Sequence, residues 1–72
     1  MPFVNVRIVR QVIAADPEAK KAAISAEIAQ VIARETGLPT SDVWIVFDEI
    51  EARDWYLGPS SVHKLRFDHS SE

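Results

Sequence analysis

The run VWIVF at positions 43–47 constrains the fold of this 72-residue chain more than any other feature. A strand with water on one face alternates apolar and polar residues, whereas this run is apolar throughout, so both of its faces are expected to be buried. The earlier run FVNVRIV, from Phe3 to Val9, is rich in β-branched residues. It predicts another strand, with Val4, Val6 and Ile8 on one face.

One long helix is predicted between these two strands. Asp16 is a suitable N-cap and Pro17 suits the first helical position, while Gly37 and Pro39 predict an end near Thr36. Four apolar residues recur at helical spacing on one side: Ile24, Ile28, Val31 and Ile32. The order strand, helix, strand predicts a βαβ unit with parallel strands and a right-handed crossover.

The chain is too short to bury both faces of this sheet by itself. After the second strand, the Gly58–Pro59 pair predicts a hairpin, with short strands around 55–57 and 61–65, and the polar end 68–72 is expected to fray. The single helix covers one face, and the chain has no cysteine for disulfides. We therefore expect one domain, residues 1–72, of α+β class: a β-α-β unit with a C-terminal hairpin, in an oligomer.

Composition argues against several kinds of partner. The net charge is −3 and the eight Lys and Arg residues are scattered, which disfavours nucleic acid. His63 and His69 form no zinc motif, and no metal site is expected. A solvated edge is expected from the acidic run Asp48, Glu49, Glu51 and Asp54. Because the apolar run at 43–47 cannot span a membrane and no signal peptide is recognisable, we expect a soluble, cytoplasmic protein.

Pro2 is the first candidate for chemistry. Proline is tolerated at the start of a strand because it cannot donate to a ladder there, so its position has a purely structural explanation. If Met1 is removed, however, the ring nitrogen becomes a basic secondary amine. An exposed α-amino group has a pKa of about 7.7 to 8.0, and an apolar site lowers it, which suits a group that takes and returns a proton near neutral pH.

Arginine and tryptophan side chains are the candidates for substrate binding. Arg10, Arg7 and Arg53 could bind a carboxylate in bidentate fashion or stabilise an enolate oxygen. By themselves their positions favour plain surface residues, Arg53 above all. Trp55 lies beside a turn, where it could line a pocket or fill a subunit contact. Pro2 and Arg10 are separated by about 27 Å of extended chain, so a site that uses both must combine different subunits.

Five stretches together resemble the tautomerase superfamily, specifically its 4-oxalocrotonate tautomerase-like branch. They are PFVNVRIV, DPEAKKAAI, TGLP, VWIVFDEI and DWYLG, and the resemblance covers residues 2–65. No single motif is specific, but the order, spacing and length agree. The resemblance implies a βαβ unit with a C-terminal hairpin, assembled as a homohexamer, a trimer of dimers.

The resemblance also implies an activity. Met1 is removed, and Pro2 acts as general acid–base in the enol–keto conversion of unsaturated 2-oxo or 2-hydroxy acids, without a cofactor. Trp55 is similar to the family's pocket-lining aromatic residue, which comes from a neighbouring subunit. Arg10 and Arg7 are then the candidates for binding the substrate carboxylate.

Two departures from the family pattern keep other interpretations open. The loop RQVIAAD replaces a short Gly-Arg turn, so Arg10 is only an approximate substitute, and Trp44 stands where the family has its second arginine. The chain could therefore be a catalytically inactive oligomeric subunit or binding module. It could also catalyse a related proline-dependent reaction, hydration or dehalogenation of an unsaturated acid.

Overall fold

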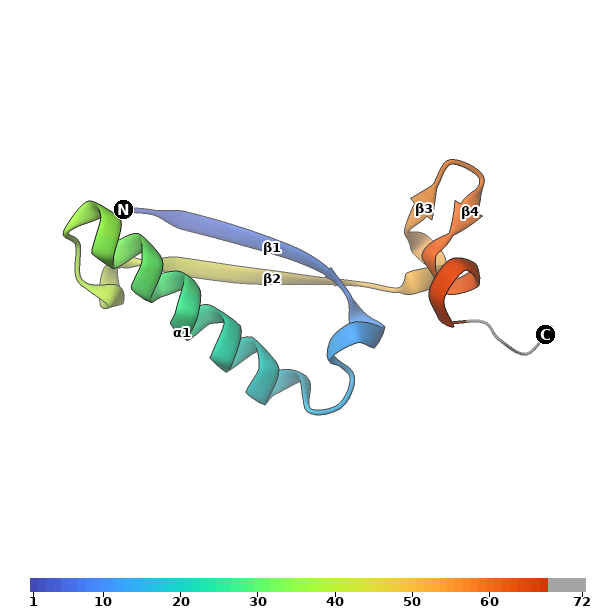
Figure 1. The fold of residues 1–72 in the computed structure, drawn as a ribbon, viewed down its shortest axis with the longest axis horizontal. Coiled ribbons are helices and arrows are strands. Elements are labelled where there is room, and N and C mark those ends of the chain that lie inside the picture. Colours follow the sequence, from blue (N-terminus) through green and yellow to red (C-terminus); the bar gives the residue numbers. More distant parts are fainter. Residues whose placement is uncertain (68–72) are drawn as a thin grey trace.

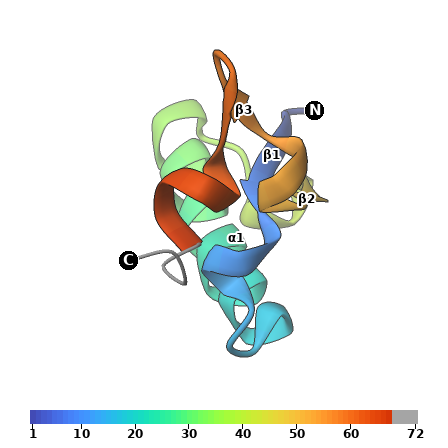
Figure 2. The ribbon, with the colours of Figure 1, turned by 90° about the vertical axis from the view of Figure 1, so that its right-hand side faces the viewer.

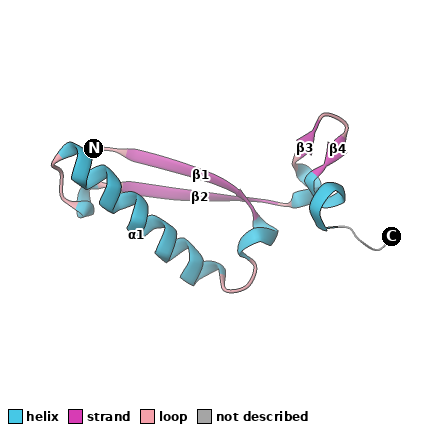
Figure 3. Cartoon of the chain, viewed as in Figure 1, coloured by secondary structure: helices cyan, strands magenta, loops and turns pink. Residues whose placement is uncertain are grey.

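The computed structural model describes residues 1–67 of the chain. Two parallel strands, β1 (Phe3–Val9) and β2 (Trp44–Ile50), are connected by the long helix α1 (Pro17–Thr36). A small antiparallel hairpin, β3 (Tyr56–Leu57) and β4 (Ser60–Ser61), follows. Figure 1 shows the hairpin beyond the far end of β2, and Figure 3 shows short helical turns at the connections. The predicted β-α-β unit with a C-terminal hairpin is confirmed.

Local signals fix both ends of α1 as the sequence predicts. The Asp16 side chain accepts a hydrogen bond of 3.2 Å from the backbone N–H of Ala19, and Pro17 occupies the first turn. Asp16 itself adopts a left-handed conformation with φ 85°. At the other end Gly37, with φ 79°, donates its N–H to the Ala33 carbonyl at 2.8 Å. A left-handed residue at this position is the usual way in which a glycine ends a helix.

The sheet has one face covered by α1 and one open face (Figure 2). Val4, Val6 and Ile8 are half-buried, whereas the intervening residues of β1 point to the open face. Three apolar side chains are exposed on that open face: Phe3 at 61%, Trp44 at 57% and Val46 at 41%. Within a single chain, one helix covers only one face of β2, as expected. Burial of the second face by another subunit stays a prediction.

The buried core of one chain is very small. Among the described residues, only Ile13, at 3% exposure, and Ala52, at 0%, are buried apolar residues. Ile13 belongs to a short 3₁₀ helix, Arg10–Ile13, in the segment that the sequence analysis treats as an apolar loop. The radius of gyration is 15.6 Å, whereas a compact chain of this length has about 11 Å. The chain is thus too extended to form a core of ordinary size.

The hairpin is shorter than predicted. Its second strand ends at Ser61, and His63–Phe67 form a π-helical turn, so the prediction of a strand reaching Leu65 is wrong. The Ser61 hydroxyl accepts a hydrogen bond of 3.2 Å from the Lys64 N–H, which favours the turn over further pairing. Gly58 supplies the left-handed residue of the hairpin, with φ 64°. Residues 68–72, expected to fray, and His69 among them, lie outside the described residues.

Candidate active site

Pro2 lies at the start of the sheet, directly before β1. It is half-buried, and its carbonyl accepts a hydrogen bond of 3.0 Å from the backbone N–H of Trp44. Phe3 and Trp44 are paired in register on the two strands and share the open face of the sheet. With Met1 attached, the Pro2 nitrogen is an amide and carries no proton to exchange. Removal of Met1 would leave a secondary amine beside two exposed aromatic rings.

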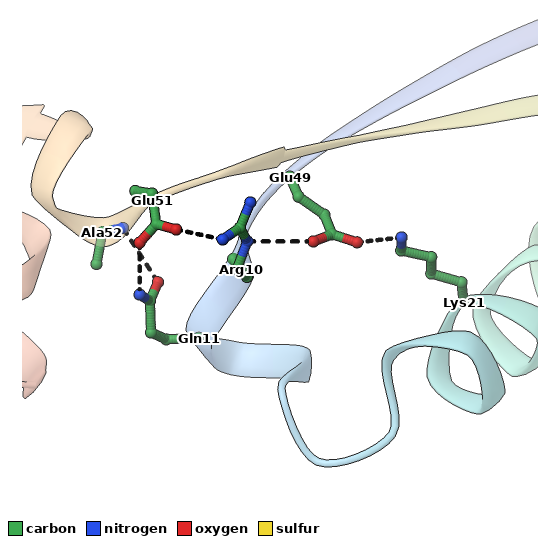
Figure 4. A network of polar contacts seen from close by, with 6 residues as sticks. All are labelled: Arg10, Gln11, Lys21, Glu49, Glu51 and Ala52. Atoms are coloured by element: carbon green, nitrogen blue, oxygen red, sulfur yellow. Dashed lines mark hydrogen bonds and ion pairs between the residues drawn. The ribbon is translucent and has the colours of Figure 1, made fainter.

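Arg10 lies at the other end of β1, in a network of charged and polar groups (Figure 4). Its guanidinium lies 3.4 Å from a Glu49 oxygen and also forms an ion pair with Glu51. Glu49 in turn pairs with Lys21 of α1. Arg10 is a candidate for binding the substrate carboxylate. Within one chain, however, its guanidinium already pairs with two carboxylates of the protein itself, those of Glu49 and Glu51.

The same network fixes the turn that follows β2. The Gln11 side chain donates a hydrogen bond of 3.0 Å to Glu51 and accepts one of 3.1 Å from the backbone N–H of Ala52 (Figure 4). The hydrogen bond from Lys21 is the main cause that lowers the pKa of Glu49, and the charges of Lys21 and Arg10 add to it, while partial desolvation opposes it. The network therefore connects β1, β2 and α1 through opposite charges.

Sequence reasoning missed this network. It placed the acidic run at a solvated edge and did not assign Gln11 or Lys21 any role. The parallel pairing was the signal that could have revealed it, because register brings Val9 opposite Ile50 and hence Arg10 close to Glu49 and Glu51. Opposite charges at adjacent ends of two parallel strands are expected to form ion pairs.

Arg7 lies on the open face in the middle of the sheet. Its guanidinium is 3.6 Å from Asp48, which also accepts a hydrogen bond of 3.2 Å from Asn5. The Arg7 side chain is 65% exposed, so this pair is solvated and weak. Replacement of Asp48 by another carboxylate as the partner of Arg7 would therefore cost little free energy.

Trp55 and Arg53 lie near the hairpin. Trp55 is half-buried, and its carbonyl accepts a hydrogen bond of 2.7 Å from the Val62 N–H, which joins it to the C-terminal segment. Arg53 is exposed in a 3₁₀ turn. Figure 1 places the N-terminus and the hairpin at opposite ends of the molecule, which is 50 Å long. Pro2 can therefore meet Arg10 or Trp55 only if a second copy of the chain contributes them.

Other parts of the described structure offer less chemistry. Between α1 and the start of β2 lies an open groove of about 490 Å³, lined by small and uncharged residues such as Ala26, Ala29 and Ile45, and by none of the candidate site residues. Within residues 1–67, no three His, Asp or Glu side chains gather as metal ligands would. No helix in that range is long and apolar enough to cross a membrane.

Two solved structures share this fold, a parallel βαβ unit followed by a hairpin. DmpI from Helicobacter pylori has a TM-score of 0.78 at 20% identity, covering 94% of this chain and 100% of that one. A 4-oxalocrotonate tautomerase isozyme from Methylibium petroleiphilum has a TM-score of 0.75 at 20% identity, covering 90% and 98%.

Sequence comparison gives the family. The tautomerase enzyme family matches residues 2–65, so the match begins at Pro2. The probable tautomerase K2 of Dickeya dadantii (strain 3937) is 30% identical over 66 residues, which are 92% of this chain and 94% of that protein. The chain belongs to the tautomerase family, as the sequence resemblance predicts. Membership supports an isomerase of the tautomerase type, in a family whose members are oligomeric and bind small molecules.

Proposed function

We propose that the protein is a tautomerase that uses Pro2, after removal of Met1, as general acid–base on unsaturated 2-hydroxy or 2-oxo acids. The observation that carries this proposal is the position of Pro2. Pro2 directly precedes the first residue of β1, and its carbonyl accepts a hydrogen bond from the Trp44 N–H. The aromatic side chains of Phe3 and Trp44, which flank it on the two strands, are exposed. Partial exclusion of water there favours the neutral amine, the form that accepts a proton.

The proposed reaction moves one proton and needs no cofactor. The Pro2 nitrogen takes the proton of the enol hydroxyl, and the oxygen lone pair forms the carbonyl while the carbon–carbon double bond shifts. The protonated nitrogen then donates a proton to the substrate carbon at the far end of the enol or dienol, which gives the keto isomer. Because one proton is taken and one returned, Pro2 is regenerated and the product is an isomer of the substrate.

The substrate carboxylate requires a cation, and we assign this role to Arg7 and Arg10. Arg7 is exposed and weakly paired, so it can bind a carboxylate directly. Arg10 is engaged by Glu49 and Glu51, and it would have to release one of them to bind substrate. Trp55 would form an apolar wall. Arg10 and Trp55 lie at the far end of their own chain, and Arg7 is five residues along the strand from Pro2, about 17 Å away. All three would therefore come from neighbouring subunits.

A site shared between subunits requires a stable assembly, for which we propose the homohexamer, a trimer of dimers. The small core of one chain, its extended shape and the exposed Phe3, Trp44 and Val46 support self-association. Sedimentation velocity at micromolar concentration should then give a mass of about 49 kDa, six times 8.1 kDa. A stable folded monomer would contradict the assembly.

Ketonisation of phenylenolpyruvate, followed by ultraviolet absorbance, tests the role of Pro2. Positioned acid–base groups contribute about 10² to 10⁴ in rate, so Pro2→Ala should lower kcat/KM by at least about a hundredfold. Pro17→Ala is the matched control, because it removes a proline in the first turn of α1, at the end of the helix away from the N-terminus (Figure 1), and should leave the rate unchanged. Equal rates for wild type and Pro2→Ala would contradict the proposal.

A second candidate function is a non-catalytic oligomeric subunit or binding module. The engagement of Arg10 by Glu49 and Glu51 favours it, because a substrate would have to compete with two internal carboxylates. Intact-mass measurement of protein from its native host separates the two functions. Complete retention of Met1 would support the binding module, since Pro2 would then remain an amide. Hydration or dehalogenation of an unsaturated acid is the alternative chemistry if Pro2 is free and ketonisation is absent.

A further inference from the structure

Trp44 lies beside Pro2 on the neighbouring strand. The Trp44 backbone is fixed there, because its N–H donates to the Pro2 carbonyl and its Cα is paired with that of Phe3. Neighbouring strands are about 5 Å apart, so the indole lies at the same end of the sheet as the Pro2 nitrogen. It is 57% exposed and lies beside Phe3, which is 61% exposed. These two side chains form an apolar surface that faces outward.

Among residues 1–67, no Lys or Arg side chain of the same chain is placed on this part of the open face. Arg7 is four residues along β1 from Phe3, about 13 Å away, and is paired with Asp48. Arg34 lies at the end of α1, on the covered side of the sheet, and is paired with Glu35 at 3.4 Å. Of the other basic residues, Arg10 and Lys21 belong to the network at the opposite end.

This distribution of charge discriminates between substrates. A substrate must place its reacting enol beside Pro2, and the group that extends over Trp44 meets an aromatic ring without a positive charge. An apolar or aromatic group is stabilised by contact with the indole. A second carboxylate would lose water there without gaining an ion pair, which is unfavourable.

We propose that Trp44 determines the specificity of the Pro2 site, selecting enol acids with one carboxylate and an apolar or aromatic tail over dicarboxylic enol acids. The inference rests on the proposed function, because it assumes that Pro2 reacts with an enol. It goes beyond that function by naming the substrate class and the residue that selects it.

Three enol acids test the selection: phenylenolpyruvate, 2-hydroxypenta-2,4-dienoate and 2-hydroxyhexa-2,4-dienedioate. The last two differ by a terminal carboxylate on the same dienol. For wild type, kcat/KM should be at least about tenfold higher for each monocarboxylate than for the dicarboxylate. Trp44→Arg should reduce or reverse this ratio by at least about tenfold, because it places a cation beside Pro2. Trp44→Phe, which keeps an aromatic ring, should preserve the ratio.

Glu35→Gln is the control for net charge. It raises the net charge by one unit, as Trp44→Arg does, at a side chain that is 70% exposed on α1. It should leave the ratio unchanged. Sedimentation of every variant identifies changes that arise from altered assembly.

Several results would overturn the inference. A wild-type preference for the dicarboxylate would do so, and so would an unchanged ratio in assembled Trp44→Arg. If Trp44→Arg does not assemble, the inference is tested by the kcat/KM ratios of wild type and Trp44→Phe. Loss of the monocarboxylate preference in Trp44→Phe would contradict selection by an aromatic ring. Absence of turnover of all three acids by wild type would overturn the proposed function and this inference with it, whereas turnover without preference would overturn the inference alone.

Discussion

Truncation of Ile13 should destabilise the protein far more than truncation of its neighbour Val12. Both residues lie in the same 3₁₀ turn, but Ile13 is 3% exposed and Val12 is 53% exposed. Ile13→Ala removes three carbon atoms from the core, worth about 2.4 kcal/mol at about 0.8 kcal/mol each. The cavity left behind adds to this, so the total loss is about 2.5 to 5 kcal/mol.

Val12→Ala is the matched control. It removes two carbon atoms that are already half in water, so its cost should stay below about 1 kcal/mol. Urea denaturation followed by circular dichroism, at one fixed protomer concentration, measures both changes in the free energy of unfolding. The corresponding fall in Tm for Ile13→Ala is roughly 10 to 40 °C. Equal losses for the two variants would refute the argument that Ile13 anchors the fold.

Two further predictions concern charge and helix capping. Since Lys21 and Arg10 lower the pKa of Glu49, the unfolded chain binds the Glu49 proton at higher pH than the folded chain does. The stabilisation by Glu49 should be complete at pH values above 4.5, the ordinary pKa of glutamate, and should be lost as the pH falls through the folded pKa. Glu49→Gln should therefore flatten the acid side of a plot of unfolding free energy against pH. An unchanged acid side would contradict this. Asp16→Ala should cost about 1 kcal/mol in urea denaturation because the N–H of Ala19 loses its acceptor, whereas Asp16→Asn, which keeps an oxygen, should cost little. Equal losses for both Asp16 variants would contradict a capping role.

The elements set by local signals were predictable from the sequence. The helix Pro17–Thr36 has a capping residue, a first-turn proline and a C-terminal glycine within reach of its ends. The strand Phe3–Val9 follows from β-branched residues in an alternating pattern. These signals act over a few residues, so they can be read without the rest of the fold.

Features that depend on strand register were not predictable in the same way. The ion pairs of Arg10 and the position of Trp44 beside Pro2 arise when β1 and β2 pair across 34 intervening residues, from Val9 to Trp44. The burial of Ile13 depends on the same long-range arrangement. Composition and periodicity describe one segment at a time and do not specify which segments meet.

The distance between Pro2 and the hairpin has a genetic consequence. If Pro2 of one chain and Trp55 of another form one active site, each chain contributes its Pro2 to one site and its Trp55 to a different site. A variant defective only at Pro2 and a variant defective only at Trp55 would then be inactive alone, while a mixed assembly would contain some intact sites. Co-expression of two inactive alleles would restore part of the activity, and the recovered fraction would report how many chains meet at each site.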